Sequence, residues 1–239
     1  LQPSELLIAE GSEETLLELS NETGVALTPL SRGAYDSASV EKRVAGLFKT
    51  SSLDAFGSFS RPEIGALGAI VEYLELTQKG KLPLLRSPVR ETAGGVMQID
   101  AATRRNLELT HALSGGRKGS LLSVVDRTVT AAGARLLERR LASPSLSLEV
   151  IGDRHDAVES LFYPNLGSNL RDALRKVPDL DRALSRLSLD RGGPRDLAAI
   201  RNGLEQAELI ANICGDGLPA LLNTAAGALR GHDALLELL

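Results

Sequence analysis

The sequence predicts a mainly α-helical protein in which a helical bundle follows a partial α/β domain. Within the first fifty residues, short apolar runs alternate with amphipathic segments, a rhythm typical of α/β domains. From Asp100 onward, apolar residues recur at helical spacing between capping residues and prolines. Because residues 80–98 are rich in proline and glycine, we place the change of domain there, giving domains 1–91 and 92–239.

The N-terminal region contains two predicted strands and two predicted helices. The apolar run at 5–9 suits a buried strand, and Ser12 can cap a helix that reaches Leu19. A second strand is expected at 24–27, and Asp36 opens the next helix. Two strands are too few for an independently stable sheet, so we expect a fragment that lacks strands from a longer protein.

Capping signals divide the rest of the chain into helices. Ser60 and Glu63 have capping-box spacing around Pro62. The residues that begin the later helices are Thr130, Ser147, Asp179 and Pro194. Apolar spacing predicts the inward-facing residues of three of these helices, which are Ile151, Val158 and Phe162, then Leu180, Leu184 and Leu187, then Leu197, Ile200, Leu204 and Ala207.

Composition excludes several classes of protein. Of the 239 residues, 43% are hydrophobic, which argues against disorder, yet no run approaches the ~18–20 apolar residues of a membrane span. The net charge of −4 predicts no general attraction to nucleic acid, although residues 100–195 carry a small basic excess. Aromatic residues make up 3% and tryptophan is absent, which argues against a surface that binds single-stranded nucleic acid by stacking on its bases. A single cysteine, Cys214, excludes an internal disulfide framework.

The sequence contains no recognisable catalytic or metal-binding constellation. His111, His155 and His232 have no metal-ligand spacing, and Cys214 has no plausible base beside it. We expect His155 to pack on the apolar face of its helix, between Ile151 and Val158. We therefore predict no catalytic, cofactor-binding or metal-binding residue in this chain.

Two glycine-containing segments have a superficial likeness to phosphate loops. The run 114–120 has the sequence SGGRKGS, but its lysine precedes the last glycine, whereas a P-loop needs glycine followed directly by Lys and Ser or Thr. Gly80-Lys81 is followed by leucine, without the hydroxyl that holds magnesium. Both are better interpreted as connectors. Four paired arginines could contact phosphates but are more commonly surface residues, and these are Arg104, Arg105, Arg139 and Arg140.

Several ordered blocks resemble the MutS family of DNA mismatch repair proteins. The blocks are 99–109 (IDAATRRNLEL), 119–122 (GSLL), 126–130 (DRTVT), 133–137 (GARLL) with Pro144, 179–182 (DLDR) with Arg186-Leu187, and 194–197 (PRDL). Phe56-Gly57 and the following helix resemble the end of the family's connector region. The resemblance covers essentially the whole chain, with small departures at Ala132, Arg140 and Asp181.

The resemblance implies a role for a longer protein. MutS proteins are dimers that encircle mismatched double-stranded DNA, use ATP and magnesium, and recruit MutL in the bacterial cytoplasm. Neither the family's Phe-x-Glu wedge nor a Walker motif occurs here. The resemblance therefore implies a non-catalytic part without a cofactor of its own. This part comprises the end of the connector and the first section of the helical core, whose levers relay between the ATPase and the DNA clamp. We also expect this part to be monomeric and not to bind membranes.

Two alternatives remain open from the residues alone. One is an autonomous helical nucleic-acid-binding module that uses the basic region 100–195. The other is a small hydrolase built on His155 and nearby acidic residues, which predicts that these side chains converge in a cleft.

Overall fold

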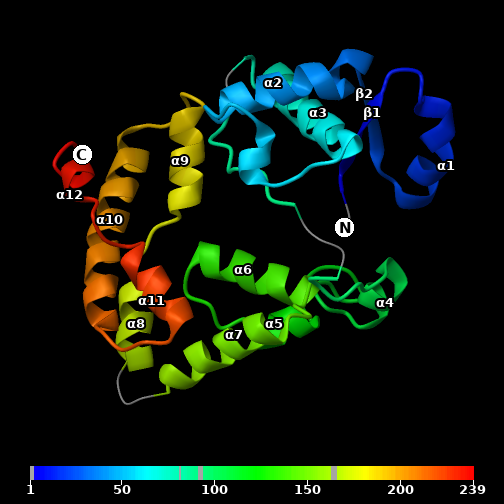
Figure 1. Ribbon diagram of the computed structural model, residues 1–239. Helices are drawn as coiled ribbons and strands as arrows, with labels where there is room; N and C mark the ends of the chain where they lie inside the picture. Colours follow the sequence, from blue (N-terminus) through cyan, green and yellow to red (C-terminus); the bar gives the residue numbers. More distant parts are fainter. Residues whose placement is uncertain (1–2, 81, 91–93, 163–165) are drawn as a thin grey trace. The chain divides into compact units, whose positions relative to one another are not determined.

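The computed structural model describes residues 3–80, 82–90, 94–162 and 166–239, and it divides into two compact units (Figure 1). The first unit comprises Leu1–Glu91 and the second Thr92–Leu239. The first combines a small sheet with helices, and in the second the described elements of regular secondary structure are helices, apart from an isolated bridge between Val96 and Ser145. The predicted fold class, mainly α with a partial α/β unit in front, is confirmed.

The first unit begins with a two-stranded parallel sheet. Strands β1 (Glu5–Ala9) and β2 (Ala26–Leu30) pair with Glu5 opposite Ala26. Helix α1 (Glu13–Thr23) connects them and ends at Gly24, which adopts a left-handed conformation with φ 69°. Because α1 extends beyond Leu19 and Gly24 forms its C-cap, the second strand begins two residues later than predicted.

Two helices pack together to form the core of the first unit. They are α2 (Ser37–Leu47) and α3 (Arg61–Thr77), with the short 3-10 turns η1 (Arg32–Tyr35) and η2 (Leu53–Phe56) beside them. Val40 and Val44 of α2 are buried with Ile64 of α3, the face that apolar spacing gives them. Asp36 caps α2 by accepting a hydrogen bond from Ser39 N at 3.1 Å, whereas Ser12 makes no side-chain cap at α1.

The second unit contains nine described helices. They are α4 (Ala101–Asn106), α5 (Leu121–Val125), α6 (Ala131–Ala142), α7 (Leu148–Ser160), α8 (Leu166–Leu174), α9 (Leu180–Ser188), α10 (Pro194–Cys214), α11 (Ala220–Gly227) and α12 (Asp233–Leu236). The longest, α10, packs against α8, α9 and α11, and α11 packs against α7 (Figure 1). The buried stripe of α10 includes Ile200, Gly203 and Ala207.

Helix α7 presents a different face to its neighbours from the one predicted. Val158 is 55% exposed and Phe162 is 84% exposed, while Ala157 and Ser160 are buried. The small side chains of Ala157 and Ser160 let α11 approach α7 closely. This packing buries them in preference to the larger apolar residues that the spacing predicts to face inward. His155 lies on the exposed side of α7, so the expectation that it packs among aliphatic residues is wrong.

Two leucines predicted to face inward are largely exposed. Leu184 of α9 is 39% exposed, and Leu197 of α10 is 44% exposed. On α9 the smaller Ala183 is buried instead, beside the partly buried Leu180 and Leu187. The packed stripe of α9 therefore keeps Leu180 and Leu187, as predicted, but contains Ala183 in place of Leu184.

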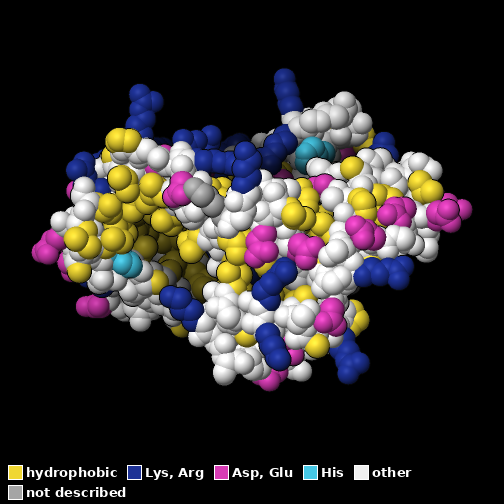
Figure 2. Space-filling model, turned by 90° about the horizontal axis from the view of Figure 1, so that it is seen from above, with side chains coloured by type: hydrophobic (Ala, Val, Ile, Leu, Met, Phe, Trp, Pro, Cys, Tyr) yellow, Lys and Arg dark blue, Asp and Glu magenta, His cyan; other side chains and the backbone are white. Residues whose placement is uncertain are grey.

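The surface carries both signs of charge together with hydrophobic side chains (Figure 2). Acidic and basic residues are interspersed on the face shown, in agreement with the small net charge. Within the described ranges, every helix is too short or too polar to cross a bilayer.

Candidate functional site

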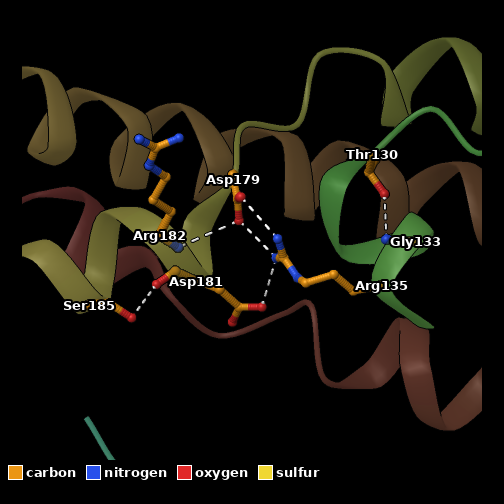
Figure 3. A network of polar contacts seen from close by, with 7 residues as sticks. All are labelled: Thr130, Gly133, Arg135, Asp179, Asp181, Arg182 and Ser185. Atoms are coloured by element: carbon orange, nitrogen blue, oxygen red, sulfur yellow. Dashed lines mark hydrogen bonds and ion pairs between the residues drawn. The ribbon is translucent and has the colours of Figure 1, made fainter. Parts of the chain in front are cut away.

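The most extensive described ion-pair network in the second unit joins α6 to the start of α9. Arg135 projects from α6, one turn after the residues that begin this helix. Thr130 fixes that beginning, since its hydroxyl oxygen accepts a hydrogen bond from Gly133 N at 3.0 Å (Figure 3). The cap predicted at Thr130 is thus present and determines where Arg135 lies along the helix.

Arg135 binds two carboxylates at once (Figure 3). Its Nη1 donates to Asp179 Oδ2 at 3.1 Å, and its Nη2 donates to Asp179 Oδ1 at 2.9 Å. The same Nη2 donates to Asp181 Oδ2 at 3.1 Å. Two parallel hydrogen bonds to one carboxylate form the fork geometry that only arginine provides. We call Arg135, Asp179 and Asp181 the Arg135 network.

Asp179 has a second role within this network. Its Oδ1 accepts a hydrogen bond from Arg182 N at 3.5 Å, so the carboxylate that binds Arg135 also caps α9 (Figure 3). The hydrogen bond from Arg135 lowers the pKa of Asp179, with the positive charge of Arg135 adding to it. The same interaction raises the pKa of Arg135. Asp179 is therefore ionised and accepts hydrogen bonds from both Arg135 and Arg182 N. Such a carboxylate connects two helices and is a poor candidate for a general base.

A second group of polar contacts connects α9 to α10. Arg186 Nε donates to Asp196 Oδ2 at 3.2 Å, and Arg186 Nη2 donates to the Arg191 carbonyl oxygen at 3.0 Å. Asp196 also accepts a hydrogen bond from Gly193 N at 2.9 Å, which lowers the pKa of Asp196, as does Arg186. These bonds fix the turn through which the chain passes from α9 into α10.

The three histidines lie apart from this network. His111 is exposed, with its Nδ1 3.1 Å from Thr110 Oγ1. His232 is half-buried, and its Nε2 lies 3.4 Å from the Ala228 carbonyl oxygen. His155 is exposed on α7, among acidic residues that are exposed as well. The geometry therefore gives no support to the hydrolase alternative, which needs these groups to converge in a cleft.

Cys214 and the acidic residues suggest no reactive centre. Cys214 is half-buried at the end of α10, and burial raises the pKa of its thiol, which keeps it in the less reactive protonated form. In the described parts of the chain, His, Cys, Asp and Glu form no group of three or more that could hold a metal ion.

The segment 114–120 is a compact connector. Gly115, Gly116 and Gly119 adopt positive φ angles that favour glycine. Ser120 is fully buried, and its hydroxyl donates to the Arg117 carbonyl oxygen at 2.7 Å. Arg117 in turn pairs with Glu138 of α6 at 2.5 Å. The glycines therefore serve the turn, while Lys81 of the other candidate loop lies outside the described residues.

The four paired arginines are in different surroundings. Arg104 is structural: its Nη1 donates to the Ala142 carbonyl oxygen at 2.7 Å, tying α4 to the end of α6. Arg105, Arg139 and Arg140 are exposed. Desolvation lowers the pKa of Arg140, and the positive charges of Arg154 and Arg139 lower it further.

The Arg135 network could not be predicted from the sequence. Arg135 and Asp179 are 44 residues apart, and no local sequence motif indicates that they interact. The cap at Asp179 was visible from the sequence, but its bond to Arg135 depends on how α6 and α9 are placed.

In the first unit, a groove of about 320 Å³ lies between α3 and the segment that follows it. Its apolar lining includes Leu67, Ile70 and Val89. At its edge Arg90 Nε donates to Glu63 Oε1 at 2.9 Å, and Arg90 Nη1 donates to the Ser58 carbonyl oxygen at 3.3 Å. These contacts fasten the end of the unit to the beginning of α3.

Comparison with known proteins assigns a family to both units. The sequence model described as MutS domain II matches residues 1–86, and the one described as MutS domain III matches residues 102–237. Proteins named DNA mismatch repair protein MutS are 62% identical in Cereibacter sphaeroides (strain ATCC 17025), 59% in Paracoccus denitrificans and 58% in Roseobacter denitrificans. These matches cover 99–100% of this chain but 27% of the length of each relative. The chain belongs to the MutS family, of which it spans the regions of domains II and III.

Proposed function

We propose that this chain provides the connector and core-lever parts of a MutS-type mismatch repair protein. The observation that carries the proposal is that the matches to MutS domains II and III each fall on one of the two compact units. In this role the helices transmit changes of conformation between a nucleotide site and a DNA clamp, both of which are supplied by other parts of the full-length protein.

The second unit has the physical properties that a lever requires. With 21 residues at about 1.5 Å each, α10 is roughly 31 Å long. Its buried stripe is packed by α8, α9 and α11, so a displacement at one end is passed to its neighbours. The Arg135 and Arg186 ion pairs fix α9 at both of its ends. Such packed helices move as units, which is the supporting argument for a relay.

We infer that the chain itself catalyses no reaction. The sequence has no Walker motif, and ATP with magnesium would bind to the ATPase part of the complete protein. On this proposal mismatched DNA, MutL and a second copy of the protein are partners of the complete protein in the bacterial cytoplasm, at the nucleoid when it acts on DNA. The chain as given would then be a monomer.

A binding and turnover assay tests the non-catalytic part of the proposal. We expect no ATP hydrolysis above a blank. Fluorescence anisotropy titrations at one fixed salt concentration should give the same affinity for a duplex containing a G·T mispair and for its matched duplex. Turnover above the blank, or tighter binding to the mispaired duplex, contradicts it.

A chimera tests the lever part. The matching segment of the Cereibacter sphaeroides MutS is replaced by this chain, and mutation frequency is measured in cells that lack their own MutS. We expect the chimera to lower the frequency as the intact relative does. A chimera in which Gly203→Leu disrupts the α9–α10 contact serves as the control and should fail. A stable, expressed chimera that leaves the frequency high contradicts the proposal.

A second candidate function is DNA binding by the basic region 100–195. The exposed Arg105, Arg139 and Arg140 favour it, whereas Arg104 is already bound to carbonyl oxygens. If these three arginines bind phosphates, reversing each to Glu weakens binding and lowers the slope of log affinity against log salt by about 0.9 per lost contact.

The matched control for this test reverses three basic residues of the first unit, Lys42, Lys49 and Arg61, which are also exposed. Equal losses in the two triple variants would show a general charge effect and contradict a binding site on α4 and α6.

A further inference from the structure

The second unit consists of two groups of helices, each with its own internal contacts. The N-terminal helix group, residues 94–162, is tied together by bonds such as Met97 N to the Pro144 carbonyl oxygen at 2.8 Å and Arg117 to Glu138. The C-terminal helix group, residues 166–239, is built around α10, which packs against α8, α9 and α11.

Two contacts between described residues of the groups lie away from the point where the chain passes from one group to the other. At one, α7 packs against α11, with the small buried residues Ala157 and Ala226 on the two helices. At the other, Arg135 of α6 binds Asp179 and Asp181 at the start of α9 (Figure 3). The first contact is apolar and non-directional, whereas the second has the fixed geometry of a guanidinium fork.

Helix α6 has little apolar anchorage of its own. None of its side chains is fully buried, and Leu136 is 36% exposed. The position of α6 relative to α9 therefore depends strongly on the Arg135 network. That network is itself accessible to water, since the side chain of Arg135 is 50% exposed and that of Asp179 is 28% exposed. Salt screens ion pairs that water can reach, and even a bidentate pair at the surface contributes far less than the packed core, so the network can open and close without unfolding.

We propose that the Arg135 network is a salt-sensitive latch that holds the two helix groups at one relative angle, and that its opening lets them pivot about the contact of α7 with α11. This inference concerns the fold of the second unit and goes beyond the lever function proposed above. Opening of the latch also affects α9, because Asp179 is the N-cap of this helix. Without Arg135, the Asp179 carboxylate keeps only its long hydrogen bond from Arg182 N, so the first turn of α9 loosens as the groups separate.

Distance measurement between the two groups tests the latch. Spin labels are attached through Glu149→Cys on α7 and Glu205→Cys on α10, both exposed, after Cys214→Ser has removed the native thiol. Pulsed electron paramagnetic resonance then gives the distribution of label distances. We expect one narrow distribution for the parent chain, and a broader distribution with a shifted mean for Arg135→Gln.

Three further variants separate the latch from general damage. Asp179→Asn keeps a good helix cap but loses the charge, so it should broaden the distribution as Arg135→Gln does, and the double variant should add no further broadening. Arg135→Lys keeps the charge but loses the fork, and an intermediate width is expected. Arg175→Gln removes an ion pair of 2.6 Å between Asp172 of α8 and the residue that follows this helix, all within one helix group, and it should leave the distribution unchanged.

Salt gives a readout that needs no substitution in the network. Raising the ionic strength from about 0.1 M to about 1 M shortens the Debye length from about 10 Å to about 3 Å. We expect the parent distribution to approach that of Arg135→Gln, which should itself hardly respond. Identical narrow distributions in the parent chain, Arg135→Gln and Asp179→Asn at both salt concentrations would overturn the latch, and would leave the lever proposal to be decided by the chimera.

Discussion

Gly68 of α3 lies so close to Ala34 of η1 that a Cβ atom at position 68 would be 2.5 Å from the Ala34 carbonyl oxygen. Val40 of α2 is closer still, since its Cγ2 would be 2.3 Å from the same Cβ atom. The absence of a side chain at Gly68 therefore allows α3 to pack against both η1 and α2, and this triple contact holds the first unit together.

Gly68→Ala should destabilise the first unit by about 2 kcal/mol. The added methyl group meets a backbone carbonyl that cannot rotate away, and overpacking of this kind outweighs the gain of roughly 1 kcal/mol in helix propensity. Hydrogen exchange followed by mass spectrometry on peptides from α2 and α3 measures the loss. Gly46→Ala is the control: a Cβ atom there meets nothing within 4 Å, so exchange should stay the same or slow down.

Gly203 makes the corresponding contact in the second unit, but with a side chain. A Cβ atom at position 203 would be 2.4 Å from Leu180 Cδ2. Because a leucine tip can shift, we expect Gly203→Ala to destabilise the α9–α10 joint by about 1 kcal/mol, less than Gly68→Ala destabilises its unit. Hydrogen exchange of α9 and α10 reports this difference.

Measuring Gly203→Ala in a chain that also carries Leu180→Ala tests whether the contact with Leu180 causes the loss of stability. With the leucine tip removed, Gly203→Ala should become stabilising by about 1 kcal/mol, because only the helix-propensity term remains. Gly152→Ala on α7, where a Cβ atom has open space, should be stabilising in either background. A loss of stability at Gly203 that is the same with and without Leu180 would show that the contact is not the cause.

Local signals in the sequence were sufficient to locate most helix starts. Thr130 and Ser147 each accept a hydrogen bond from a backbone amide three residues later, at 3.0 and 3.3 Å, as their spacing predicted. Such caps depend only on neighbouring residues. The buried face of α7 was predicted wrongly because it is decided by α11, about seventy residues further along the chain, and the bond of Arg135 to Asp179 was missed for the same reason.

The beginning of α3 should respond to acid through Glu63. The pKa of Glu63 is lowered from its ordinary 4.5 to about 2, first by the hydrogen bond from the Ser60 hydroxyl, then by the Ser60 N–H and by Arg90. Because the folded pKa is the lower one, the stabilisation is complete above about pH 4.5 and is lost as the pH falls toward 2.

Nuclear magnetic resonance titration of the Glu63 carboxyl carbon checks this ordering of causes. Ser60→Ala should raise the pKa of Glu63 more than Arg90→Gln does, since the hydroxyl contributes most. Glu63→Gln, which keeps an acceptor for the Ser60 N–H, should remove the acid-dependent fraying of the first turn of α3. A larger effect of Arg90→Gln than of Ser60→Ala would contradict the assignment.

Ser120 is the position at which a single hydroxyl group should matter most in the second unit. It is fully buried; its Oγ donates to the Arg117 carbonyl oxygen at 2.7 Å and accepts from Ser123 N at 3.2 Å. Ser120→Ala leaves Ser123 N without its partner and removes one of two bonds to the Arg117 carbonyl oxygen, which still accepts from Ser120 N at 3.1 Å. We expect a loss of about 1–3 kcal/mol in the free energy of unfolding. Ser120→Thr adds a methyl group to a site with no exposed surface and should also destabilise.

Thermal unfolding followed by circular dichroism measures both variants, and hydrogen exchange locates the effect in α5 and the loop before it. Ser143→Ala provides the control, because Ser143 is exposed at the end of α6 and should change stability by less than about 0.5 kcal/mol. The connector 114–120 pairs with α6 through Arg117 and Glu138, so loosening at Ser120 should also raise exchange in the middle of α6. Exchange confined to the loop would show that this ion pair does not couple the two segments.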